Sequence, residues 1–509
     1  MSRKRRFITA LGSGYLALIA NVVFAVVSVP LALHYLTKEE FGLWSVVLQL
    51  TGYLSLLDLG VGQSVSRLLV DSKDNMEDGT YGSVLKTAIV VFALQAVTIG
   101  ILGFTCSRVA GQLMNIPSGL SSTFESLLIW QSQVVAITFL ATPLISIPLW
   151  SHQRSDISNL SVVATFAVNL GFLWLGFALG LKTFSLLVSN IAGTAVSISL
   201  NGWAVVRLKL LPSQENWGAL SWDRFWEVFR FSRDLFLINL ASQLISASQI
   251  VLVSRLMGLD AAAVWSICMK SFTMAQLVVC RVLDFAAAGL SEMIVRCEGA
   301  RFRSRLGSIV AISAIGAGYF GVLGALGNRS FVQLWTNGRI TWNAWNDLFA
   351  GIYIICICVT RCYTGIGGLV KRVGSYKYVS LLEGILVIAG SVVLVPRLQF
   401  LGVLSSSIFA DLLCSGLYGV VRVRKYFDIS VAEVTSDWLS GPCRFILLFA
   451  LAGSAIFWAG SRFQGFLAFG CTAVLTALIG LVLAFLVGLP TEFRKEIIVL
   501  THKLGLRFS

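Results

Sequence analysis

Three ionisable residues, Lys270, Arg281 and Asp284, lie within one apolar stretch of the sequence, residues 261–288. A helix turns by about 100° per residue, so Arg281 lies about 20° around the axis from Lys270, and Asp284 within about 60° of both. An ammonium and a guanidinium on one helix face attract phosphate strongly where the dielectric constant is low. The spacing therefore predicts an anion-binding stripe. In the alternative, Arg281 pairs with Asp284 at i, i+3 and only Lys270 faces a ligand.

The elements that carry these residues are apolar enough to cross a membrane. Of the 509 residues, 56% are hydrophobic and 13% are charged, and the mean hydropathy is +0.82. A bilayer core takes about 20 apolar residues per helix, so we predict an all-α polytopic membrane protein with about 14 transmembrane helices. The predicted spans are 8–36, 41–66, 83–107, 123–149, 157–180, 184–206, 231–255, 261–288, 304–327, 346–370, 376–395, 401–421, 443–460 and 464–489. The connections between them are too short to enclose a soluble catalytic domain.

The basic residues orient the chain. Positively charged loops stay preferentially in the cytoplasm, and most of the 39 Lys and Arg fall in loops that are cytoplasmic when the "MSRKRR" start is inside. Both termini are then cytoplasmic. Lys270 lies about 14 Å below the outer surface, close to the midplane. The net charge of +14 follows from this bias and from anionic lipid headgroups, so it does not indicate nucleic-acid binding.

Signals for metal, cofactor or enzyme chemistry are missing from the sequence. The ten cysteines include no CxxC pair, and the three histidines are scattered. The sequence has no G-x-x-x-x-G-K-[ST] loop for ATP. We therefore expect no cofactor, no metal, no enzymatic activity and no direct ATP hydrolysis by this chain.

A helix–turn–helix pattern occurs twice. "HYLTKEEFGLWSVVLQL" (34–50) and "SRLMGLDAAAVWSICMKS" (254–271) align at Trp44-Ser45-Val46 and Trp265-Ser266-Ile267. An even number of predicted helices separates the copies, which predicts a parallel repeat of two six-helix lobes, 1–215 and 216–430, followed by an extra helix pair and tail, 431–509. Residues 221–233 are aromatic on one face and form either an interfacial linker helix or an extension of the seventh span.

These features resemble a known transporter family. The basic N-terminus, the motif "FGLWSVVLQLTGYLSLLDLGVG", the repeated helix pair and the fourteen spans are similar to the polysaccharide-transporter branch of the multidrug/oligosaccharidyl-lipid/polysaccharide exporter superfamily. That branch includes the O-antigen and capsule repeat-unit flippases. The resemblance implies alternating access between two lobes of a bacterial inner-membrane protein. It also implies an undecaprenyl pyrophosphate-linked oligosaccharide as cargo, for surface polysaccharide biosynthesis.

The same resemblance implies partners and leaves alternatives open. The expected partners are the lipid-linked oligosaccharide and membrane lipids, with a polysaccharide polymerase and a chain-length regulator as candidate partner proteins. A lipid II flippase has closely related cargo chemistry. A multidrug/cation antiporter of the same superfamily would need a cavity dominated by carboxylates, whereas the midplane residue of the eighth span is Lys270.

Neutral polar side chains add candidate substrate contacts on two further spans. In the seventh span, Asn239, Gln243 and Ser246 fall close to one face. In the second span, eighteen residues make five whole turns, which predicts a stripe through to Arg67. The members of this stripe are Gln49, Tyr53, Gly60, Gln63 and Arg67. For each of these groups, a hydrogen bond between helices is the structural alternative to substrate contact.

Asp58 stands out in "SLLDLGVGQSVSR" because its carboxylate precedes a Gly-Val-Gly triplet. A nucleotide loop would need a βαβ unit, and this segment lies in an apolar helix. On a continuous helix Asp58 lies about 180° from Gln49 and Arg67. We therefore expect Asp58 to face away from the cavity, as a packing and pairing element at the inner gate.

Three more ionisable residues lie in the predicted second lobe: Arg361, Glu383 and Asp411. Charges inside a membrane are costly and are usually paired. We expect each in a buried ion pair within the second lobe, with substrate contact as the alternative for each. Asp58, Asp284 and Asp411 are the candidate coupling or gate acids.

Overall fold

The computed structural model describes residues 3–72, 78–220, 222–296, 298–366, 374–460, 466–489 and 494. Over these residues the chain is helical and contains no strand, which confirms the all-α prediction. Thirteen helices are long and apolar enough to cross a membrane. This number over the described residues is consistent with the prediction of about fourteen, and the 26-residue helix α11 (Lys270–Val295) carries the charges of the eighth predicted span.

The chain divides into two compact units, Met1–Ala263 and Val264–Ser509. The first contains α1 (Arg3–Tyr35), α2 (Lys38–Leu54), η1 (Ser55–Asp58), α3 (Val61–Ser72), α4 (Thr80–Leu113), α5 (Ser118–Ala141), α6 (Ser146–Ser151), α7 (Ser155–Ala178), α8 (Phe184–Arg207), η3 (Gln214–Asn216) and α9 (Trp222–Met257). The boundary between the two units falls within helix α10 (Leu259–Cys268). The second contains α11, α12 (Gly299–Trp335), α13 (Ala344–Thr364), α15 (Tyr376–Leu398), α16 (Phe400–Asp411), η4 (Leu412–Gly416), α17 (Leu417–Phe427), η5 (Glu433–Asp437), α18 (Ser440–Gly460), α19 (Phe466–Leu483) and η6 (Ala484–Gly488). The predicted lobe boundaries at 215 and 430 stay a prediction.

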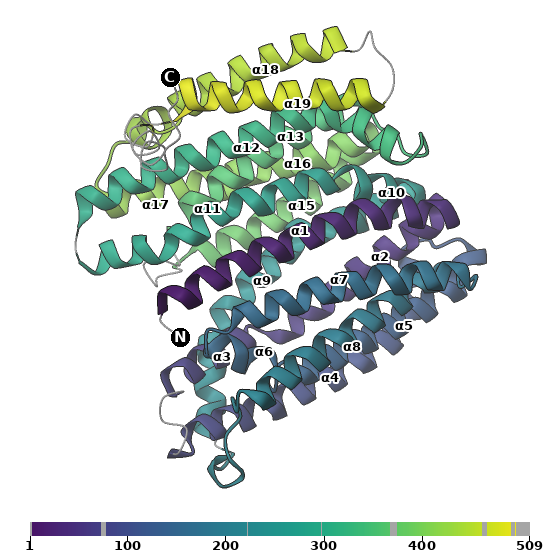
Figure 1. Ribbon diagram of the computed structural model, residues 1–509, viewed down its shortest axis with the longest axis vertical. Coiled ribbons are helices and arrows are strands. Elements are labelled where there is room, and N and C mark those ends of the chain that lie inside the picture. Colours follow the sequence, from purple (N-terminus) through teal and green to yellow (C-terminus); the bar gives the residue numbers. More distant parts are fainter. Residues whose placement is uncertain are drawn as a thin grey trace. The chain divides into compact units, whose positions relative to one another are not determined.

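Helix α4 shows how these elements suit a bilayer. Leu94, Val97 and Ile101 follow one another at helical spacing and are 65%, 61% and 57% exposed. Phe92 and Ile99, on the other face, are buried in the core of the first unit. An apolar outer face is unfavourable in water but is the normal surface of a helix in lipid. Within this unit α4 packs along α5, and α7 packs along α8 and α1 (Figure 1).

The second predicted span, 41–66, is interrupted rather than continuous. Helix α2 ends at Leu54, a short 3₁₀ turn covers Ser55–Asp58, and α3 starts at Val61. Leu59 and Gly60 take the left-handed conformation, with φ of 52° and 77°. Glycine adopts this conformation without a steric penalty, so the first glycine of the Gly-Val-Gly triplet allows the chain to turn here.

The fourth predicted span, 123–149, is also divided, because α5 ends at Ala141 and the short helix α6 begins at Ser146. Pro143 lies between them, and proline has no backbone N–H with which to continue the hydrogen bonds of a helix. Residues 222–233 are continuous with the seventh span in α9, so they extend that span rather than forming a separate helix.

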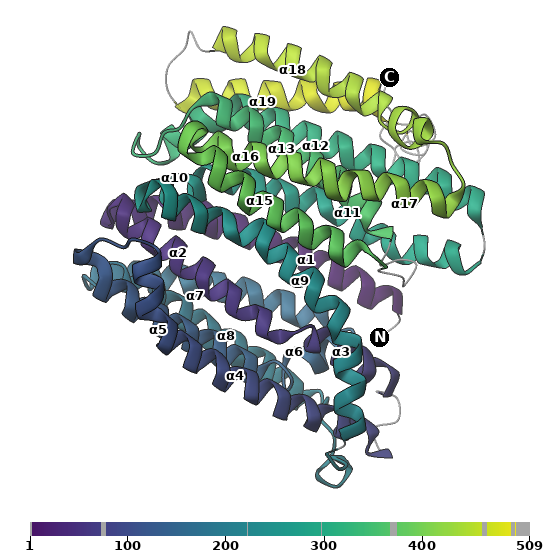
Figure 2. The same ribbon diagram turned by 180° about the vertical axis from the view of Figure 1, so that it is seen from behind.

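The two copies of the repeated sequence pattern share a buried tryptophan, on α2 and on α10. Thr37 caps α2, accepting a hydrogen bond from the backbone N–H of Glu40, whose carboxylate accepts from the N–H of Thr37. Trp44 and its counterpart Trp265 are both buried, at 6% and 2% exposure. In the second unit, α18 and α19 run side by side, and α18 also packs along α12 (Figure 2).

Candidate functional site

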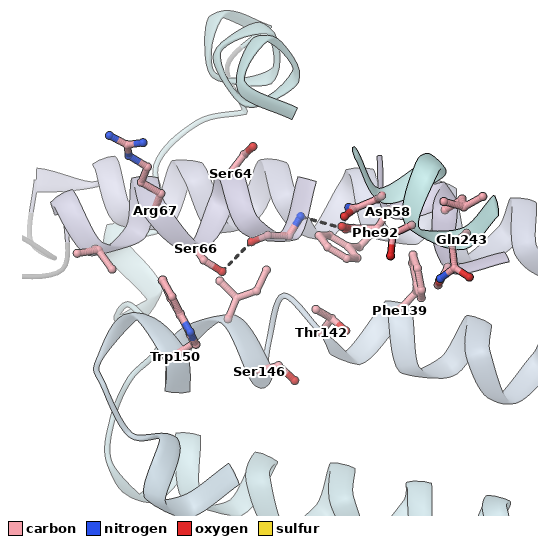
Figure 3. Close-up of a pocket in the computed structure, with 17 residues that line it drawn as sticks. Asp58, Ser64, Ser66, Arg67, Phe92, Phe139, Thr142, Ser146, Trp150 and Gln243 are labelled. Atoms are coloured by element: carbon pink, nitrogen blue, oxygen red, sulfur yellow. Dashed lines mark hydrogen bonds between the residues drawn. The ribbon is translucent and has the colours of Figure 1, made fainter. Parts of the chain in front are cut away.

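The first unit holds a cavity of ≈ 1120 Å³ where η1 and α3 approach α4, α5, α6 and α9 (Figure 3). Its lining combines side chains from the interrupted second span with Asn239, Ser242 and Gln243 of α9. Phe92 and Phe139 supply apolar wall on the α4 and α5 side. The cavity lies entirely within residues 55–243 and is therefore a property of this unit alone.

Asp58 and Arg67 both line this cavity. The expectation that Asp58 faces away from it is wrong. That expectation assumed about 100° per residue along one helix, whereas the left-handed residues Leu59 and Gly60 redirect the chain between Asp58 and α3. Asp58 lies toward the end of the cavity near Phe92 and Gln243, and Arg67 lies toward the end near Trp150 (Figure 3).

The carboxylate of Asp58 is occupied by the start of α3. Its Oδ1 accepts a hydrogen bond of 3.0 Å from the backbone N–H of Gly62. The first four N–H groups of a helix have no partner within the helix, and a side-chain oxygen just before it commonly accepts from one of them. The side-chain amide of Gln95 donates to the backbone carbonyl of Asp58 at 3.3 Å. Asp58 is therefore a cap that holds the interruption together.

Hydroxyl groups form the largest polar class in the lining. Those with an assigned donor role donate to carbonyls of their own or the preceding helical turn, at 2.6–3.1 Å, and a hydroxyl oxygen is an acceptor as well as a donor. They are Ser55, Ser64, Ser66 and Thr142. Ser146 and Ser242 also line the cavity. A surface of hydroxyl acceptors suits a ligand that is rich in hydrogen-bond donors.

The predicted polar stripes are only partly brought together. Asn239 and Gln243 line the cavity, whereas Ser246 is exposed and donates to the carbonyl of Ser242 at 2.7 Å. Gln49 is half-buried on α2 and does not line this cavity. The side chain of Gln63 lies outside the described residues.

Arg67 and Trp150 add a cation and a large aromatic surface to the lining. Trp150, on the short helix α6, is 59% exposed. Arg67 is the basic residue of this lining, and Asp58 is the acidic one. Asp58 caps α3, and Arg67 is the cation that this lining contributes.

In the second unit, Asp284 joins two arginines from different helices. Arg361 on α13 donates to Oδ1 of Asp284 at 3.1 Å. Arg281, which lies on α11 together with Asp284, has its guanidinium 3.8 Å from Oδ2. The i, i+3 pairing of Arg281 and Asp284 is therefore present. The side chains are 59%, 38% and 50% exposed for Arg281, Asp284 and Arg361, so the ion pair expected for Arg361 is present but is not buried. The cluster keeps one positive charge in excess.

Lys270 is the first residue of α11 and is half-buried. Within the described part of the chain, no hydrogen bond or ion pair engages its ammonium. A half-buried ammonium without a protein partner is costly unless a ligand or water meets it.

The two acids at 383 and 411 are buried but are not ion-paired among the described residues. Asp411 is 3% exposed and accepts from the hydroxyl of Thr360 at 2.9 and 3.2 Å. Glu383, also 3% exposed, accepts from the hydroxyl of Ser415. Ser415 belongs to the π-helical turn η4. The expected buried ion pairs of Glu383 and Asp411 are thus replaced by hydroxyl contacts.

Sequence reasoning missed two features near these sites. Trp150 and Ser146 line the cavity because α6 is separate from α5, and Pro143 was the available signal. Asp347 is fully buried in the second unit. Its place at the start of a predicted span gave no reason to expect burial. Over the described residues, no group of three or more His, Cys, Asp or Glu side chains could hold a metal ion.

Comparison with known proteins identifies the family. A family described as "Polysaccharide biosynthesis protein" matches residues 10–285, which is more than half of the chain. No curated protein matches the sequence.

Among solved structures, an inward-facing multidrug resistance MATE family transporter of the MOP superfamily has a TM-score of 0.66 at 12% identity, covering 83% of this chain and 99% of that one. The lipid II flippase MurJ, in an inward closed conformation, has a TM-score of 0.67 at 11% identity, covering 98% of this chain and 99% of that one. A MOP superfamily transporter from Pyrococcus furiosus has a TM-score of 0.56 at 11% identity, covering 83% and 96%. The chain has the fold of these transporters, and it belongs to the polysaccharide biosynthesis protein family.

Proposed function

We propose that this protein is a flippase that moves an undecaprenyl pyrophosphate-linked oligosaccharide repeat unit across the bacterial inner membrane by alternating access. The product would serve surface polysaccharide biosynthesis, and both termini would lie in the cytoplasm. The observation that carries the proposal is the polar cavity of the first unit, whose lining includes Arg67. Membership of the polysaccharide biosynthesis protein family supports this proposal.

The cavity suits a carbohydrate headgroup. Sugar hydroxyls are donors as well as acceptors, and the lining offers hydroxyl lone pairs, the amides of Asn239 and Gln243, and the ring of Trp150. Such mixed lining, with a few placed polar groups on an apolar wall, is typical of small-molecule sites. Its volume of ≈ 1120 Å³ exceeds the usual range of about 300–1,000 Å³ for drug-sized ligands, which favours an oligosaccharide over a single small drug.

The cations suit the diphosphate. Lys270 has no partner among the described side chains, and Arg67 lines the cavity. The Arg281–Asp284–Arg361 cluster retains one positive charge. Ammonium and guanidinium groups form charge-assisted hydrogen bonds with phosphate oxygens. A cationic drug would be repelled by the same groups, so a multidrug/cation antiporter is disfavoured.

A lipid II flippase is the second candidate function. Lipid II is also a sugar carried on a lipid diphosphate, so the arguments from charge and hydroxyls apply to it equally. The specific observation in its favour is coverage: the match to MurJ spans 98% of this chain, against 83% for the MATE transporter. The family description favours a polysaccharide repeat unit.

Among the three candidate coupling acids, Asp411 is the strongest. Asp58 caps a helix, and Asp284 already neutralises part of two guanidinium charges. Asp411 is buried on a hydroxyl contact with Thr360 and has no cationic partner among the described residues. A buried carboxylate in this state is well placed to exchange a proton or bind a monovalent cation.

The test replaces the midplane cation. Lys270→Ala should abolish surface polysaccharide export in a strain that lacks its own exporter, while the protein remains inserted and abundant. Lys270→Arg should retain part of the activity because it keeps the charge. Lys377→Ala is the matched control, since Lys377 lies at the start of α15 and its ammonium rests on the ring of Tyr378.

Two outcomes would contradict the proposal. Normal export by Lys270→Ala would show that the Lys270 ammonium does not take part in transport. Loss of peptidoglycan precursor export with intact surface polysaccharide would favour the lipid II flippase. The lipid-linked oligosaccharide that accumulates in the inner leaflet should be extracted and identified, because its sugars distinguish the two cargoes.

A further inference from the structure

The helix that carries Lys270 is interrupted immediately before it. Helix α10 ends at Cys268, Met269 is the N-cap of α11, and Lys270 is the first residue of α11. The direction in which the Lys270 side chain leaves the backbone therefore depends on the geometry of this junction. Whatever holds the junction also places the ammonium.

Asn328 of α12 bridges the two sides of the junction. Its side-chain amide donates to the backbone carbonyl of Cys268 at 3.1 Å, and its side-chain oxygen accepts from the hydroxyl of Ser271 at 2.6 Å. The carbonyl of Cys268 ends α10, where helix carbonyls lack a partner within the helix. Asn328 is 3% exposed. Its two ends thus join the last residue of α10 to the residue next to Lys270.

Asp347 determines which way the Asn328 amide points. Its Oδ1 accepts from the amide of Asn328 at 2.7 Å and from the indole N–H of Trp342 at 2.8 Å. A carboxylate and a carbonyl are acceptors only, so the NH₂ of Asn328 must face Asp347 and Cys268, and its oxygen is left for Ser271. Trp342 in turn packs edge-to-face on Trp265 of α10, at 6.4 Å between ring centroids.

The cost of this arrangement indicates a role beyond packing. Asp347 is completely buried, and its second oxygen, Oδ2, has no hydrogen-bond partner among the described residues. Burying a half-satisfied carboxylate is unfavourable, and an apolar core at this place would be more stable. One turn before Asn328, a Cβ on Gly324 would overlap the ring of Phe272, so α12 approaches the first turn of α11 closely.

We propose that Asp347 and Asn328 are positioning residues that hold Lys270 in place for the diphosphate of the cargo. Asp347 orients Asn328, and Asn328 fixes Cys268 and Ser271 on either side of the junction. The inference rests on the proposed function, in which Lys270 binds the diphosphate. A structural network alone would stabilise the contact of α11, α12 and α13 without any link to ligand affinity.

A double-mutant cycle separates these two roles. The probe is geranylgeranyl diphosphate, titrated into the purified full-length protein in detergent, with Ser271→Ala measured alone and together with Lys270→Ala. If Ser271 and Asn328 act through Lys270, Ser271→Ala should weaken binding about three- to tenfold when Lys270 is present and have no further effect when it is absent. Asn328→Ala should behave in the same way, with a larger loss.

Ser415→Ala is the matched control, because it removes a comparable hydroxyl contact with a buried carboxylate, that of Glu383, on other helices. Its effect on binding should be negligible in both backgrounds. Thermal unfolding of each unliganded variant checks that it is folded. If Asn328→Ala does not accumulate as folded protein, Ser271→Ala carries the test by itself.

Each remaining outcome overturns a specific statement. An equal loss of affinity in both backgrounds would show that the network acts on the fold and not through Lys270. No loss in either background would remove Ser271 and Asn328 from the site. Unchanged affinity in the Lys270→Ala single variant would overturn the proposed role of Lys270. This result is obtained without the double variant.

Discussion

Two substitutions of Asp58 distinguish a structural role of this acid from a role in ion coupling. Its Oδ1 accepts from the N–H of Gly62 at 3.0 Å, and this bond caps α3 after the interruption of the second span. Asp58→Ala removes the acceptor, which costs about 1 kcal/mol by analogy with other helix caps. Asp58→Asn keeps an oxygen in the same place and loses only the interaction of charge with the helix dipole, about 0.3–1 kcal/mol.

These values predict different export by two variants of one residue. Asp58→Asn should export surface polysaccharide at close to the wild-type level, with a melting temperature lower by less than about 2 °C for a chain of this size. Asp58→Ala should export less, because α3 carries Arg67 and its first turn loses a partner. Export is measured as surface glycan normalised to protein in the membrane, and unfolding is followed on the purified protein. Abolished export by Asp58→Asn at normal abundance would refute the capping role and make Asp58 a titrating acid.

Two further predictions concern packing and charge. Gly42→Ala should sharply reduce the amount of folded protein recovered from membranes, because a Cβ there would overlap the backbone carbonyl of Leu259, whereas Gly12→Ala, with no atom within 4 Å of its Cβ, should be recovered normally. Asp284→Asn should tighten binding of geranylgeranyl diphosphate several-fold at low salt and less at high salt, because it frees the guanidiniums of Arg281 and Arg361 from their shared carboxylate. Affinity that is unchanged at both salt concentrations would mean that these guanidiniums do not meet the ligand.

Much of the fold follows from composition and hydropathy. Long apolar runs predict helices because a backbone in lipid must satisfy its own hydrogen bonds. The number of spans and the all-α class were predictable on this ground. The interruptions were less so, since apolar residues continue through them. Gly60 and Pro143 mark two of the breaks, but glycine and proline also occur inside unbroken membrane helices, such as Pro30 in α1.

The site was predictable only where a helix is continuous. Arg281 and Asp284 lie on the unbroken helix α11, and their i, i+3 pairing was derived correctly from helical spacing. The phase of Asp58 relative to Arg67 was wrong because two left-handed residues lie between them. The partner of Arg361 lies on another helix, and the burial of Asp347 depends on α12 and on Trp342. Such contacts between distant segments have no periodicity that one sequence can reveal.

Two of the helix interruptions, before α3 and before α11, explain why polar residues gather beside them. Breaking an apolar helix frees backbone N–H and C=O groups, which lipid cannot satisfy, so each break needs polar side chains nearby. At the first, Asp58 accepts from the N–H of Gly62; at the second, Asn328 donates to the carbonyl of Cys268. Non-helical backbone at this depth is tolerated where it is enclosed by protein or lines a water-filled cavity. A helix break therefore supplies, at one place, the opening and the hydrogen-bonding groups that a hydrophilic cargo requires.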